Sequence, residues 1–153
     1  MSEAGFDEWV KDTGIIRNGA RIRSVPRNAA FVLDTIERHG SFGAFLADHR
    51  PDQFAQLLEH LRRRGDRLGD KTAQYFLREA GVDSYVLSDD VMLRLSIEGV
   101  ADKLPSSSRA RQAIQRAFDT WQAESGRNLT YVSRVLAMSV ESPRVSRFSQ
   151  PPA

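Results

Sequence analysis

The residues of this sequence best suited to chemistry form a glycine-containing turn between two helical segments. The turn is Gly65-Asp66-Arg67-Leu68-Gly69-Asp70, and the next helix begins Lys71-Thr72-Ala73. A helix-hairpin-helix binds DNA by directing free backbone N–H groups of its turn and second helix at phosphate oxygens, and glycine lets the phosphate come close. Arg67 stands where the motif usually has its first glycine. Taken alone, the motif leaves a plain helical hairpin as the alternative, and the earlier glycine of a P-loop is missing.

Arginine supplies nearly all the positive charge, and it is clustered although the formal net charge is only +2. The clusters are Arg17, Arg21, Arg23 and Arg27, then Arg62, Arg63, Arg64 and Arg67. Such patches bind phosphate backbones, but an arginine cluster on a helix is also typical of a solvated face. The residues expected to hold DNA phosphates are Arg17, Arg21, Arg67 and Lys71 with the backbone of Leu68, Gly69 and Asp70, and Thr72 lies near the helix start.

The composition excludes several classes of site. The chain has no cysteine, which excludes disulfides, thiolate metal ligands and cysteine nucleophiles. The spacing of His39, His49 and His60 indicates no metal site, so we expect neither metal nor cofactor and place each histidine at the surface. No apolar run approaches the roughly 20 residues that span a membrane, and the acidic start lacks a secretory signal. We therefore expect a cytoplasmic protein without a membrane partner.

Helical periodicity dominates, and no alternating apolar pattern indicates a strand, so we predict an all-α fold. The length of 153 residues is that of one domain, which we place at residues 1–142. The tail at 143–153 has too few apolar residues to pack, and we expect it to be disordered. The expected helices carry Phe6, Trp9 and Val10; Asn18 to Arg38; Phe42 to Leu46; Asp52 to Arg64; Lys71 to Ala80; Val91 to Ile97; Ile114 to Trp121; and Tyr131 to Leu136.

Particular residues are expected to set the ends and inner faces of these helices. Ser41 and Ser88 are predicted caps, Gly81 a predicted stop, and Pro26 is expected to kink or split the long second helix. That helix is expected to turn one apolar stripe inward, formed by Ile22, Val25, Ala29, Val32, Leu33 and Ile36. The aromatic residues expected in the core are Trp9 and Trp121, which could otherwise stack on a base, together with Tyr75 and Phe76.

Three segments resemble one protein family, in the same order and with approximately the same spacing. Residues 12–22, Asp-Thr-Gly-Ile-Ile-Arg-Asn-Gly-Ala-Arg-Ile, followed by Asn28-Ala29, resemble the Gly-Ile-Ile-Arg…Lys-Ile…Asn-Ala signature of the type I 3-methyladenine DNA glycosylases. Arg21 replaces the usual lysine. Residues 40–46 resemble the Gly-x-Phe-x-x-Phe-Leu step of that family, and residues 62–81 resemble its Lys-Arg-Gly…Val-Gly…Thr-x-x-x-Phe hairpin. The resemblance covers roughly residues 12–91.

The resemblance implies a DNA glycosylase-like helical domain built around a helix-hairpin-helix. That family flips a nucleotide out of the duplex and cleaves the N-glycosidic bond of methylated adenine, a cationic base that leaves readily from a pocket of aromatic faces with one carboxylate. Related glycosylases place a catalytic aspartate three residues before a valine; counting back from Val91, that place is Ser88. The type I family lacks this aspartate too. Asp89 and Asp90 are the remaining candidates, and their alternative role is to neutralise a helix dipole.

Departures from the family pattern leave the activity open. The family's base pocket comes from a segment before the Gly-Ile-Ile-Arg signature, of which this chain has only a few residues, and the Cys and His ligands of its structural zinc are missing. The leading interpretation is a DNA repair protein that binds double-stranded DNA and, if active, hydrolyses the N-glycosidic bond of alkylated adenine in base excision repair. One alternative is an active enzyme completed by a partner chain or an upstream start codon. Another is an inactive DNA-binding or helical interaction module that forms a homodimer through the uncovered surface.

Overall fold

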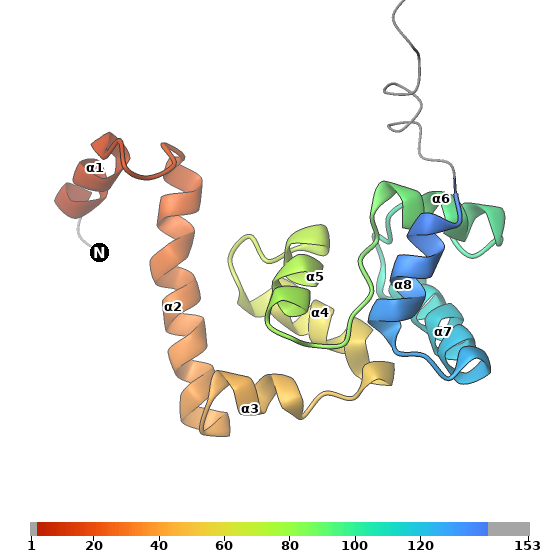
Figure 1. The fold of residues 1–153 in the computed structure, drawn as a ribbon. Helices are drawn as coiled ribbons and strands as arrows, with labels where there is room; N and C mark the ends of the chain where they lie inside the picture. The colour runs from red at the N-terminus through yellow and green to blue at the C-terminus, as the bar shows by residue number, and fades with distance from the viewer. Residues whose placement is uncertain (1–2, 141–153) are drawn as a thin grey trace, which may run out of the picture.

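The computed structural model describes residues 3–140, and these residues form an assembly of helices (Figure 1). The elements are α1 (Glu3–Lys11), α2 (Gly19–His39), α3 (Phe42–Ala47), the short 3-10 turn η1 (Pro51–Gln53), α4 (Phe54–Arg64), α5 (Asp70–Glu79), α6 (Asp89–Ile97), α7 (Ser108–Ser125) and α8 (Leu129–Met138). No strand occurs within residues 3–140, which confirms the predicted all-α class. None of the helices in this range is long and apolar enough to cross a membrane. The tail predicted at 143–153 lies outside the described residues.

Local sequence signals set most of the helix ends. Five helices begin with a side chain that accepts a hydrogen bond from the amide three residues further on, and these caps are Asn18, Ser41, Ser88, Ser107 and Asn128. Each cap satisfies one N–H group that a helix start leaves unpaired. The predicted stop at Gly81 is confirmed, because Gly81 has a φ of 82° and the Val82 amide donates to the Leu77 carbonyl across the end of α5.

The apolar core surrounds an extended segment between α5 and α6. Tyr85 of this segment is edge-on to Phe54, with ring centroids 4.7 Å apart, and stacks on Phe118 at 4.4 Å. Amides of an extended chain have no helical acceptors, so side chains supply them. Gln74 of α5 and Ser133 of α8 accept hydrogen bonds from this segment at 2.7 and 3.0 Å. These contacts fix the start of α6 relative to α5.

The long helix α2 packs with a different face from the one predicted. Val25 and Leu33 of the predicted inner stripe are 55% and 66% exposed, and only Ile22 of that stripe is buried. The buried side chains of α2 are Ile22, Ser24, Phe31 and Thr35. The stripe prediction is wrong because the opposite side of α2 is the one that packs. Phe31 on that side joins the core and contacts Phe42 of α3, and Arg27 and Asn28 bind the turn after α4. Periodicity shows that a helix is amphipathic, but it does not show which face finds a partner.

In Figure 1, α2 lies on one side of the α4–α5 pair and α6, α7 and α8 lie on the other. Helix α2 continues through Pro26 as one element of 21 residues, so the predicted split does not occur.

Three aromatic residues predicted in the core are at the surface instead: Trp9 is 47%, Tyr75 49% and Phe76 38% exposed. Trp121 does pack against the core, edge-on to Phe118.

Candidate nucleic-acid interface

The turn between α4 and α5, residues 65–69, folds tightly back on itself. A Cβ built on Gly65 would come within 2.5 Å of Leu68 Cδ1 and 2.9 Å of the Leu61 carbonyl oxygen. Leu68 occupies that space and packs against the core. Packing inside the turn therefore requires glycine at position 65.

Arg67 has the most unusual backbone conformation of the turn. Its φ is 61°, and no other non-glycine residue of the described chain has a positive φ. This left-handed conformation costs an L-residue about 1–2 kcal/mol and is normally taken by glycine. Position 67 is also where the hairpin motif has its first glycine. The turn thus keeps the glycine conformation and presents an exposed arginine from it.

The start of α5 has no side-chain cap, in contrast to the starts of α2, α3, α6, α7 and α8. Gly69 precedes this helix with φ −92° and ψ 156°, and no protein atom lies within 4 Å of a Cβ built on it. Within the described residues, the amides of Leu68, Gly69 and Lys71 have no hydrogen-bond acceptor, whereas the Thr72 amide donates to the Gly69 carbonyl. Unpaired amides at a helix start carry partial positive charge, so this end can bind an anion from outside.

Asn28 of α2 holds the turn in place, a role that the sequence prediction missed. Its Oδ1 accepts from the Asp66 amide at 2.7 Å, and its Nδ2 donates to the Asp66 carbonyl at 3.0 Å. Arg27 adds an ion pair to the Asp66 carboxylate at 2.8 Å. One side chain thereby satisfies both backbone groups of Asp66 and fixes the direction of the residues that follow. Asparagine is a poor helix former, and its position inside α2 is a signal of such a contact.

The predicted phosphate-binding arginines lie on separate elements. Arg67 is in the turn. Arg21 lies on α2 seven residues before Asn28, so these two side chains are on the same face of α2, about two helical turns apart. Arg17 comes directly before the cap of α2. All three side chains are exposed, and no acidic partner for them occurs among the side chains that the structure describes. They are therefore available to an external anion.

Lys71 and Asp89 form an ion pair that joins the starts of α5 and α6. Lys71 Nζ lies 2.6 Å from Asp89 Oδ1, so the structure brings a predicted DNA-binding residue and a catalytic candidate together. The Asp89 side chain is 65% exposed, whereas Asp90 is half-buried. Ser88, in the place of the aspartate of related glycosylases, caps α6 by accepting from the Val91 amide at 3.2 Å. Because Asp89 offsets the charge of Lys71, the positive charge of the turn depends mainly on Arg67.

Comparisons with protein-family models, with curated proteins and with solved structures find no match for this chain. No family is assigned to it on this basis. The chemistry of the turn does not depend on such an assignment, because unpaired helix-start amides and arginine side chains favour an anion in any helical protein.

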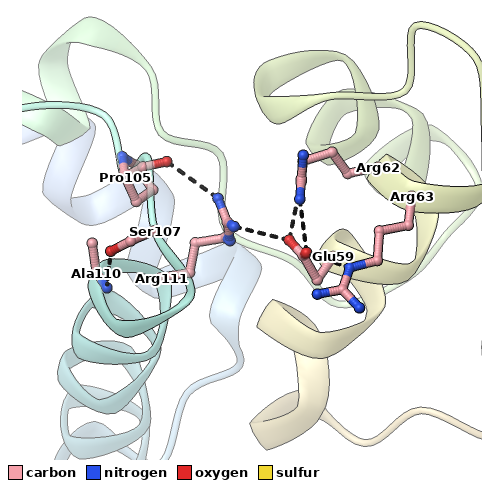
Figure 2. A network of polar contacts seen from close by, with 7 residues as sticks. All are labelled: Glu59, Arg62, Arg63, Pro105, Ser107, Ala110 and Arg111. Atoms are coloured by element: carbon pink, nitrogen blue, oxygen red, sulfur yellow. Dashed lines mark hydrogen bonds and ion pairs between the residues drawn. The ribbon is translucent and has the colours of Figure 1, made fainter.

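The arginine run before the turn is used within the protein. Glu59 of α4 forms ion pairs with Arg62 and Arg63 of its own helix at 2.8 and 2.7 Å. It also pairs with Arg111 of the neighbouring helix α7 at 2.9 Å (Figure 2). Arg64 pairs with Asp34 of α2 at 2.6 Å. Three of the four arginines in this predicted cluster therefore connect helices or neutralise a carboxylate, and Arg67 differs from them in having no acidic partner among the described residues.

The network around Glu59 predicts a specific loss of stability in acid. Hydrogen bonding from Arg62, opposed by burial and reinforced by Arg63 and Arg111, lowers the pKa of Glu59 from 4.5 to about 2. A folded-state pKa below the unfolded value gives stability that is complete above about pH 4.5 and is lost as the pH falls toward 2. We expect Glu59→Gln to lower the free energy of unfolding by about 1–3 kcal/mol at pH 7 and by much less at pH 2, measured by urea denaturation. The exposed Glu124→Gln control should change little at either pH, and a Glu59→Gln effect independent of pH would contradict this account.

The histidines are spread over the surface near α3. His39 and His60 are exposed as predicted, whereas His49 is half-buried and its Nδ1 lies 2.9 Å from the Phe45 carbonyl oxygen. Partial desolvation of the His60 ring, which lies against Phe31 and Phe45, together with the positive charge of Arg64, lowers the pKa of His60. Among the side chains that the structure describes, no group of three or more His, Asp or Glu residues is arranged to hold a metal ion.

Proposed function

We propose that this chain binds double-stranded DNA through a helix-hairpin-helix formed by α4, the 65–69 turn and α5, as part of a DNA repair protein similar to the type I 3-methyladenine DNA glycosylases. The observation that carries the proposal is the uncapped start of α5, where the amides of Leu68, Gly69 and Lys71 have no acceptor among the described residues. A phosphate oxygen would satisfy these amides and interact with the helix dipole.

The distribution of arginines supports a polymeric anion as the ligand. Arg67 lies in the turn, whereas Arg21 lies two helical turns from the point where α2 holds that turn. A small anion contacts one such point, but a DNA strand presents a phosphate at every nucleotide and can contact both. The contacts involve backbone amides and phosphates, so they position DNA without reading its sequence.

Salt dependence tests this proposal directly. If Arg17, Arg21 and Arg67 each contact one phosphate, the logarithm of the association constant should fall with the logarithm of salt concentration with a slope of about −2.7. Affinity should then drop about fortyfold between 50 and 200 mM salt, measured by fluorescence anisotropy with a labelled duplex. Arg21→Ala should reduce the slope by about 0.9, and Arg127→Ala, in the loop between α7 and α8, should leave it unchanged. Absent or salt-insensitive binding would refute the proposal.

The proposed glycosylase chemistry needs its own assay. Excess protein is incubated with alkylated duplex DNA, and released methylated bases are separated by chromatography. Release of 3-methyladenine that is lost in Asp90→Asn or Asp89→Asn would support hydrolysis with a carboxylate from the start of α6. Salt-dependent binding without base release would instead support an inactive DNA-binding module.

The exposed stripe on α2 favours a second candidate, a helical interaction module that forms a homodimer. The stripe is formed by Val25, Ala29, Leu33 and Ile36. Contiguous exposed apolar surface is typical of protein–protein contacts, and the small Ala29 side chain allows another helix to approach closely. Light scattering should then give twice the monomer mass for the wild type and the monomer mass for Leu33→Glu. A monomeric wild type excludes this candidate.

A further inference from the structure

Helix α5 carries two large aromatic rings on its outer face, in the first turns after the open helix start. Ala73, Gln74 and Leu77 face the core and are at most 3% exposed. Tyr75 and Phe76, which lie between them in sequence, are 49% and 38% exposed. Removing such rings from water is strongly favourable. Two exposed aromatic rings next to each other on one short helix therefore indicate a surface that a ligand can cover.

The positions of these rings relate them to the proposed phosphate site. Tyr75 is four residues after Lys71, about 6 Å along the helix axis, and Phe76 is seven residues after Gly69, so both rings lie within about two helical turns of the open end. The Phe76 ring contacts Phe42 of α3, with ring centroids 6.2 Å apart. Tyr75 has no ring contact or hydrogen bond within the described part of the chain. One ring is therefore fixed, and the other is open.

Aromatic rings beside cations and phosphate-binding amides are typical of surfaces that stack unpaired bases. The apolar stripe of α2 differs, because it contains aliphatic side chains without aromatic rings. Resting on the proposed function, we propose that Tyr75 is a stacking site for an unpaired base of the DNA whose phosphate is held by the 65–69 turn, with Phe76 as a second exposed ring on the same helix. The ligand class is duplex DNA containing an unpaired nucleotide, and the site contributes a preference that the backbone contacts alone do not give.

Three labelled DNAs of equal length test this inference: a fully paired duplex, the same duplex with one extra unpaired nucleotide, and the same duplex with an abasic residue at that position. The wild type should bind the base-containing bulge about tenfold more tightly than the abasic bulge, because only the first offers a ring to stack. Tyr75→Ala should abolish this preference and leave affinity for the paired duplex unchanged, whereas Tyr75→Phe should keep the preference.

Tyr131 provides the matched control. It is 50% exposed, almost the same as Tyr75, and it also neighbours a cation, with Arg127 5.1 Å from its ring centroid, but it lies on α8. Tyr131→Ala should therefore leave the preference intact. Equal binding of the two bulges by a wild type that still binds duplex DNA would overturn the stacking site alone, and so would a preference that survives Tyr75→Ala. Loss of binding to all three DNAs would overturn the proposed function and the stacking site together.

Discussion

Replacing Gly69 with valine is expected to weaken duplex binding about a hundredfold while lowering the free energy of unfolding by no more than about 1 kcal/mol, the cost of a poorer N-cap. The separation of these two effects follows from the surroundings of Gly69. Its φ of −92° and ψ of 156° suit a β-branched residue, and no protein atom lies within 4 Å of the added Cβ. The fold therefore does not need glycine here, but a phosphate approaching the neighbouring amides would meet the new side chain. Loss of one or two charge-assisted hydrogen bonds accounts for an effect of this size.

Two alanine variants give the control for this experiment. Gly43 lies on the exposed side of α3, where an added Cβ meets only Ser41 Oγ, at 3.8 Å. Gly69→Ala and Gly43→Ala both add one methyl group to open space, so both free energies of unfolding should stay within about 1 kcal/mol of the wild type. Gly69→Ala should lie slightly below the wild type because alanine is a poorer N-cap than glycine, and Gly43→Ala at or above it. Only Gly69→Ala should lower DNA affinity. Normal duplex binding by Gly69→Val would show that DNA does not approach this backbone.

Arg67→Gly is expected to move stability and DNA affinity in opposite directions. Glycine adopts the φ of 61° without the cost that arginine bears, so the free energy of unfolding should rise by about 1 kcal/mol. The same change removes a cation from the turn, so duplex affinity at low salt should fall about five- to tenfold and the salt slope should decrease by about 0.9. Urea denaturation and anisotropy titrations measure the two effects separately.

Arg67→Ala separates backbone strain from charge. Alanine keeps the strained left-handed conformation but has no charge, so it should lose DNA affinity as Arg67→Gly does without gaining stability. If Arg67→Gly destabilises the protein, the arginine makes contacts that stabilise the turn. If the affinity is unchanged, Arg67 does not face the DNA.

Helix identity and most helix ends follow from local sequence because their causes are local. Ser41 and Ser88 cap the helices expected of them, and the chain leaves α5 at Gly81 with the positive φ expected of a terminal glycine. The inner face of α2 could not be predicted in the same way. The sequence predicts its apolar stripe as the inner face, whereas the structure packs the opposite side. There Phe31 contacts Phe42, and Arg27 and Asn28 bind Asp66 almost forty residues away in sequence.

The candidate site shows the same division between local and distant causes. The glycine spacing and the Lys71-Thr72-Ala73 helix start located the turn, because a short loop between two helices has few solutions. Three features were not predicted: the left-handed conformation of Arg67, the Lys71–Asp89 ion pair and the hydrogen bonds from Asn28 to the Asp66 backbone. The last two join residues 18 and 38 positions apart, and such contacts form only when the helices pack together. The sequence predicts Tyr75 and Phe76 in the core, but both rings are exposed. Whether a ring is buried also depends on how the helices pack.

The most direct measurement is a nuclear magnetic resonance titration of the nitrogen-15-labelled chain with an unmodified DNA duplex. The central claim is that the helix start after Gly69 offers unoccupied N–H groups to a phosphate. We predict that the amide signals of Leu68, Gly69 and Lys71 shift most at low salt and return toward their free positions as salt is added, because the contact is electrostatic. Unchanged signals for these three amides, at DNA concentrations that shift signals elsewhere in the chain, would contradict the account.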